Sequence, residues 1–145
     1  MKKVLFLCTG NYYRSRFSEY LFNHLAQGKP YLADSRGLNV NPDSGNVGAM
    51  SPEVIKELQE LGINPDSDSM REPMQVQETD LAEVDRIIAV DDIAHRPMVA
   101  AKFPEWVDRV EYWRVKDLDE NPEEPPLEQL AHHIEELLLD LDQDH

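Results

Sequence analysis

The stretch Val4-Leu5-Phe6-Leu7-Cys8-Thr9-Gly10-Asn11-Tyr12-Tyr13-Arg14-Ser15 decides the fold of this chain. Its first four residues are apolar and predict a short buried strand. The strand runs into Cys8, the only cysteine in the chain, and Gly10 and Asn11 then mark a turn. From Phe17 onward, apolar residues recur at the spacing of a helix. The stretch therefore predicts a strand, a tight loop and a helix.

This loop combines a thiol at its start with a guanidinium at its end. Backbone N–H groups of a loop that enters a helix converge on one point and bind anions, and they favour the nucleophilic thiolate form of a cysteine. Arg14 adds a planar fork that can hold two oxygens of a phosphate-like group. Gly10 leaves room for close approach, and Ser15 could donate a hydrogen bond to the sulfur of Cys8. The loop is therefore predicted to seat a phosphoryl group above a nucleophile.

The same residues resemble the signature of the low-molecular-weight protein tyrosine phosphatases, whose superfamily includes arsenate reductases. That signature is an apolar strand followed by Cys-x-Gly-Asn-x-x-Arg-Ser, and the chain matches it at Cys8, Gly10, Asn11, Arg14 and Ser15. The resemblance implies that the cysteine attacks phosphorus and that the arginine binds the phosphoryl oxygens. It also implies a phosphate-binding loop, which comprises Thr9, Gly10, Asn11, Tyr12, Tyr13, Arg14 and Ser15.

The resemblance further implies a general acid in the loop after the fourth strand, usually as Asp-Pro. Asp117 lies at the matching distance from the strand expected at 109–115, so it is predicted as the third catalytic residue beside the thiol and the arginine. Leu118 replaces the usual proline, which makes Asp119 a rival and leaves Asp91 as a more distant possibility.

The rest of the chain alternates expected strands with expected helices. Further strands are predicted at 31–34, 85–90 and 109–115, and further helices at 52–61, 93–102 and over the apolar residues from Leu127 to Leu141. Four strands alternating with helices predict a three-layer α/β sandwich, and the resemblance implies a parallel sheet of order 2-1-3-4. A length of 145 residues favours a single phosphatase-like domain over residues 1–145.

Several residues outside the first stretch receive supporting roles. The segment 46–48 resembles a family loop that forms one rim of the site, but Gly45 stands where tyrosine-specific members often carry an aromatic residue. Arg71 falls where the family has a similar arginine and is interpreted as structural. Asp92 is expected to cap the helix that follows it, and His95 is expected to be a surface or packing residue.

Composition limits the partners and the compartment. The net charge of −15 argues against nucleic acid and anionic membranes. The resemblance implies a phosphorylated protein or a small phosphomonoester as partner. No stretch reaches transmembrane length, and the apolar run after Lys3 is too short for a signal peptide. A single cysteine, with His132 and His133 on different helix faces, predicts no metal site and no cofactor. A cytoplasmic location fits these features best.

The sequence therefore predicts a phosphomonoester hydrolase that acts through a cysteinyl-phosphate, with two alternatives. An arsenate reductase would need an external thiol, because the chain has no second cysteine. A catalytically weak oxyanion-binding module would keep the loop without turnover, and Tyr12, Tyr13 and the missing Asp-Pro favour it. Tyr13 stands where the phosphatases usually carry a second cysteine.

Overall fold

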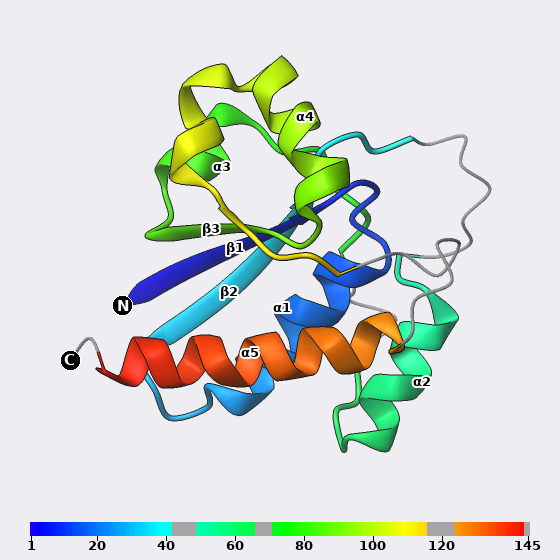
Figure 1. The fold of residues 1–145 in the computed structure, drawn as a ribbon. Coiled ribbons are helices and arrows are strands. Elements are labelled where there is room, and N and C mark those ends of the chain that lie inside the picture. Colours follow the sequence, from blue (N-terminus) through cyan, green and yellow to red (C-terminus); the bar gives the residue numbers. More distant parts are fainter. Residues whose placement is uncertain (42–48, 66–70, 116–123, 144–145) are drawn as a thin grey trace.

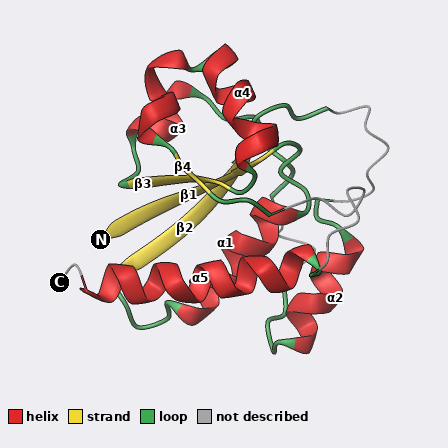
Figure 2. Ribbon diagram, viewed as in Figure 1, coloured by secondary structure: helices red, strands yellow, loops and turns green. Residues whose placement is uncertain are grey.

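A computed structural model describes residues 1–41, 49–65, 71–115 and 124–143. Its four strands are β1 (Lys2–Cys8), β2 (Tyr31–Gly37), β3 (Arg86–Ala89) and β4 (Glu111–Tyr112). They form a parallel sheet of order β2-β1-β3-β4, with helices on both faces (Figures 1 and 2). The predicted three-layer α/β fold and its strand order are confirmed.

Alternation along β1 explains how the sheet supports two separate cores. Val4, Phe6 and Cys8 point to one face, and Leu5 and Leu7 point to the other. On the first face lie α1 (Arg14–Leu25), α2 (Pro52–Glu60) and α5 (Pro126–Gln143). On the second face lie α3 (Glu78–Ala82), α4 (Asp92–Lys102) and the 3-10 helix η1 (Pro104–Arg109). Because both faces are covered, β1 is a continuous apolar run, as a central parallel strand requires.

The register brings the carboxyl ends of the strands to one level. Cys8 pairs with Gly37 of β2, and Leu7 pairs with Ala89 of β3, which in turn pairs with Tyr112 of β4. This edge of the sheet is where open α/β folds bind ligands. The loop from β1 to α1 therefore lies at the position expected for a functional site.

Some helix ends differ from the sequence-based expectations. Helix α1 begins at Arg14 rather than near Phe17, so the end of the predicted loop forms its first turn. Ser51 precedes α2 without making a side-chain cap bond, and Gly62 follows the helix with φ of 84°. The cap of α4 is Asp91, whose carboxylate accepts the Ala94 N–H, so the assignment to Asp92 is wrong.

Two elements on the second face of the sheet were also missed or misplaced. Arg109 ends η1 rather than opening the strand, because the chain after Pro104 turns to bury Trp106. Helix α3 has only five residues and one buried side chain, Leu81, so it carries no apolar periodicity to detect.

Among the described residues, no helix is long and apolar enough to cross a bilayer.

Candidate active site

Cys8 ends β1, which lies between β2 and β3 in the sheet. Its side chain is buried, and its Sγ lies 2.9 Å from Oγ of Ser15 in the first turn of α1. The following loop is fixed to the chain after β2, because the Leu38 N–H donates to the Cys8 carbonyl and the Asn39 N–H to the Thr9 carbonyl. The predicted thiol and its predicted hydrogen-bond partner are therefore in contact.

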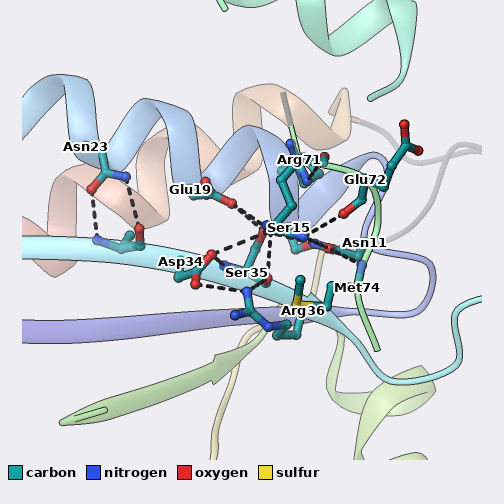
Figure 3. Close-up of polar contacts among 12 residues, drawn as sticks. Asn11, Ser15, Glu19, Asn23, Asp34, Ser35, Arg36, Arg71, Glu72 and Met74 are labelled. Atoms are coloured by element: carbon teal, nitrogen blue, oxygen red, sulfur yellow. Dashed lines mark hydrogen bonds and ion pairs between the residues drawn. The ribbon is translucent and has the colours of Figure 1, made fainter. Parts of the chain in front are cut away.

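Asn11 fixes the shape of the loop. It has φ of 53°, in the left-handed region that asparagine tolerates better than most residues, and it is fully buried. Its Nδ2 donates to Ser15 Oγ at 3.0 Å and to Ser35 Oγ at 2.9 Å, while its Oδ1 accepts from Arg71 and the Met74 N–H at 3.0 Å each (Figure 3). These four bonds use the full hydrogen-bonding capacity of the amide.

The Asn11 contact also holds the Ser15 hydroxyl beside the sulfur of Cys8. Ser15 Oγ accepts a hydrogen bond from Asn11 Nδ2 at 3.0 Å and lies 2.9 Å from Cys8 Sγ. When the thiol is deprotonated, the sulfur has no hydrogen to give, so the Ser15 hydroxyl is then the donor. A hydroxyl aimed at the sulfur stabilises a thiolate, which is the charge state that a nucleophilic cysteine needs.

Arg71 connects the loop to a buried polar cluster. Its Nη2 donates to the Ser35 carbonyl at 3.0 Å and lies 3.5 Å from Glu19, to which the Ser35 hydroxyl donates at 2.5 Å (Figure 3). Burial raises the pKa of Glu19, and the Ser35 hydrogen bond opposes that shift. Arg71 also donates to the Asn11 amide oxygen and to the Glu72 carbonyl, so it ties the loop to the end of β2.

Arg14 is buried at the start of α1 and is held from the opposite side of the loop. Its Nη1 donates to Asp91 Oδ2 at 3.1 Å and to the Val115 carbonyl at 2.8 Å. The other carboxylate oxygen of Asp91 accepts from Arg114 at 3.0 Å and from the Ala94 N–H at 3.3 Å. Asp91 is 1% exposed, so a role as a general acid has no support from its geometry.

His95 is fully buried beneath the start of the loop, so of the two roles expected for it, surface or packing, it has the buried one. Its Nε2 lies 3.2 Å from Thr9 Oγ1, and its Nδ1 accepts the Asp91 N–H at 3.1 Å. Burial lowers the pKa of His95 to about 4, and the nearby guanidinium of Arg14 adds to the shift, against the opposing charge of Asp91. The imidazole is therefore neutral near pH 7.

The remaining loop residues Gly10, Tyr12 and Tyr13 are partly exposed. Tyr12 and Tyr13 are both half-buried; the Tyr12 carbonyl accepts the Ser51 N–H at 3.1 Å, and Tyr13 packs against the core. A side chain at Gly10 would meet open space. Gly37 is the residue that close approach demands, because a Cβ there would lie 2.9 Å from the Thr9 carbonyl oxygen.

Several predicted features fall outside the described residues. These are Asp117, Asp119 and the whole of the expected rim segment 46–48. Conversely, sequence reasoning missed the contacts of His95 and the double ion pair of Asp91, because neither belongs to a contiguous motif. In the described part of the chain, no group of three His, Cys, Asp or Glu side chains could hold a metal ion.

Comparisons with known proteins identify the class to which this fold and loop belong. Residues 3–143 match the family model described as low molecular weight phosphotyrosine protein phosphatase. The chain therefore belongs to that family, and it is a phosphomonoester hydrolase.

Particular relatives agree with this assignment. A protein-arginine-phosphatase of Bacillus subtilis is 28% identical over 114 residues, which are 74% of this chain and 67% of the relative. A low molecular weight protein tyrosine phosphatase from T. tengcongensis is 28% identical, with a TM-score of 0.72 and all of both chains covered. The corresponding phosphatase from Streptococcus pyogenes has a TM-score of 0.80 at 23% identity, covering 97% of this chain and 93% of that one, and so supports the fold.

Proposed function

We propose that the chain hydrolyses phosphorylated proteins through a cysteinyl-phosphate formed on Cys8. One observation carries this proposal: Cys8 Sγ lies 2.9 Å from a Ser15 hydroxyl whose oxygen already accepts a hydrogen bond from Asn11. The hydroxyl hydrogen thus stabilises negative charge on the sulfur, at the start of a helix whose dipole favours the same charge.

The first step transfers the phosphoryl group to sulfur. The Cys8 thiolate attacks phosphorus, the bond from phosphorus to the leaving oxygen breaks, and protonated Asp117 gives its proton to that oxygen. The guanidinium of Arg14 and the N–H groups of loop 9–15 stabilise the charge on the equatorial oxygens. The contact of Arg14 with Asp91 supports this role, because it orients the guanidinium before substrate arrives.

The second step frees the enzyme. Asp117, now a carboxylate, takes a proton from water, and the oxygen of that water attacks phosphorus. The S–P bond breaks, inorganic phosphate leaves and the Cys8 thiolate is restored. Because a free thiol must survive between turnovers, we place the protein in a reducing compartment, the cytoplasm.

Phosphotyrosine is the substrate that the family description favours, and phosphoarginine is the second candidate because a relative is named for it. The two differ in the bond that breaks, P–O in one and P–N in the other. Initial rates on a phosphotyrosine peptide and on a phosphoarginine peptide of the same sequence would separate them. A higher kcat/KM on the phosphoarginine peptide would overturn the first choice and leave the role of Cys8 unchanged.

The decisive experiment on the mechanism compares Cys8→Ser and Arg14→Lys with the wild type, using p-nitrophenyl phosphate. Cys8→Ser should abolish turnover and still bind inorganic phosphate, because the loop N–H groups and Arg14 remain. Arg14→Lys should lose most activity, because an ammonium cannot reproduce the planar fork. Arg109→Lys is the matched control, since Arg109 is exposed and stacks on Trp106 away from the loop. Turnover retained by Cys8→Ser would refute the mechanism.

A further inference from the structure

A single imidazole links the first turn of α4 to the residue that follows Cys8. Nδ1 of His95 accepts the Asp91 N–H, so that nitrogen carries no hydrogen. A neutral imidazole has one ring hydrogen, which must then lie on Nε2. At 3.2 Å from Thr9 Oγ1, Nε2 is therefore the donor and Thr9 the acceptor.

The surroundings of His95 keep this direction fixed. The side chain has 0% exposure, and the charged groups that act on it are Arg14 and Asp91. A proton on Nδ1 would face the Asp91 N–H, donor against donor, and would add a positive charge beside Arg14. The bond to Thr9 therefore keeps one donor and one acceptor throughout the neutral pH range.

The same turn of α4 also holds the other end of the loop. Asp91, which supplies the N–H to His95, binds Arg14 through its carboxylate at 3.1 Å. The loop 9–15 is thus attached to this turn at Thr9 through His95 and at Arg14 through Asp91. Between these two attachments lie the residues whose N–H groups must point at one spot to bind a phosphoryl group.

We propose that His95 is a positioning residue of the phosphatase site, whose Nε2–H bond to Thr9 holds the start of loop 9–15 in the conformation that binds the phosphoryl group. The inference rests on the proposed role of that loop and of Cys8. Its physical basis is that N–H groups bind an oxyanion well only when their directions are fixed beforehand, and the backbone of Thr9 sets those directions.

The test uses variants that separate the two bonds of the imidazole. His95→Gln places an amide N–H near the position of Nε2 and can still donate to Thr9. His95→Asn places its oxygen near the position of Nδ1 and can accept the Asp91 N–H, but it is too short to reach Thr9. His95→Leu keeps an apolar volume and loses both bonds. His132→Leu is the control, because the His132 side chain is 75% exposed on α5.

Three readouts follow each variant: kcat/KM on p-nitrophenyl phosphate, the inhibition constant of inorganic phosphate, and the pH profile of Cys8 alkylation by iodoacetate. Because Cys8 is the only cysteine, alkylation reports on it alone. His95→Leu and His95→Asn should lower kcat/KM about tenfold, which is the effect of losing one hydrogen bond to a buried partner. Both variants should also weaken the inhibition by phosphate and move the midpoint of the alkylation profile to higher pH. His95→Gln should stay within about threefold of the wild type.

A second route avoids changes in the core. Thr9→Val removes the acceptor alone and should reproduce the loss of His95→Leu, and the double variant should be no worse than either single variant. Full additivity in the double variant would overturn the proposal. Equal losses in His95→Gln and His95→Asn, or losses in folding stability with unchanged kcat/KM, would also overturn it, since those results describe a merely structural residue.

Failure of the proposed function would look different. It would show as turnover in Cys8→Ser, whatever the behaviour of the His95 variants. If Cys8→Ser is inactive and every His95 variant matches the wild type in all three readouts, the mechanism stands and the positioning role falls.

Discussion

Acid should destabilise the fold through His95 in a window set by its two pKa values. Folding lowers the pKa of His95 from 6.5 to about 4, because burial and Arg14 disfavour the imidazolium. Between those values the unfolded chain binds a proton that the folded chain does not, so stability falls as pH falls. The contribution is fully present above about pH 6.5 and is lost as the pH approaches about 4.

The magnitude follows from the size of the shift. A difference of about 2.5 pKa units corresponds to about 3 kcal/mol in total, of which about 2 kcal/mol is lost between about pH 7.5 and about pH 5. Urea unfolding at these two pH values would measure it, in the wild type and in His95→Gln, which has no titrating group there. The loss of unfolding free energy should be about 2 kcal/mol smaller in His95→Gln.

Other groups titrate in the same window, so the comparison between variants carries the test. His132→Gln removes an exposed histidine and should keep the pH dependence of the wild type. Equal losses in the wild type and in His95→Gln would refute the reasoning, because they would mean that His95 takes up no proton on unfolding.

The remaining predictions concern the loop and its chemistry. Gly37→Ala should lower both the melting temperature and kcat/KM, because its Cβ would lie 2.5 Å from Val40 and 2.9 Å from the Thr9 carbonyl oxygen. Overpacking of this kind costs about 1–3 kcal/mol of folding stability. An unchanged melting temperature would contradict this prediction. Asp117→Ala should slow the hydrolysis of alkyl phosphates by about a hundredfold to ten-thousandfold and that of p-nitrophenyl phosphate by less. If Asp119→Asn shows this pattern and Asp117→Ala does not, the general acid is Asp119. Peroxide should inactivate the enzyme irreversibly, because Cys8 has no second cysteine to form a disulfide; full recovery with dithiothreitol after prolonged exposure would count against this.

The buried strands and helices could be predicted from the sequence where a local apolar pattern marked them. The apolar run of β1 predicted a central buried strand, and the apolar stripe of α5 predicted a packed helix. The end of α2 at Gly62 was marked by a residue that accepts a positive φ. Two elements on the second face were harder to predict, because η1 depends on how Trp106 packs and α3 is too short to repeat an apolar position.

The cap of α4 shows the limit of a local argument. Asp91 and Asp92 are adjacent carboxylates, and either could cap a helix on sequence grounds. Asp91 is the cap, and its carboxylate also lies between two cations, Arg14 and Arg114. Asp92 instead pairs with Arg96 on the exposed side of the helix.

The sequence by itself determined the loop between β1 and α1, because Cys8, Asn11, Arg14 and Ser15 lie within eight positions of one another and their placement depends on a single strand, loop and helix. Only the tertiary structure decided what holds that loop in place. Asn11 meets Arg71 across 60 positions of the sequence, and Thr9 meets His95 across 86. The physical reason is that such contacts depend on strand order and register, which are set by the packing of both faces of the sheet and leave no periodic trace at the residues concerned.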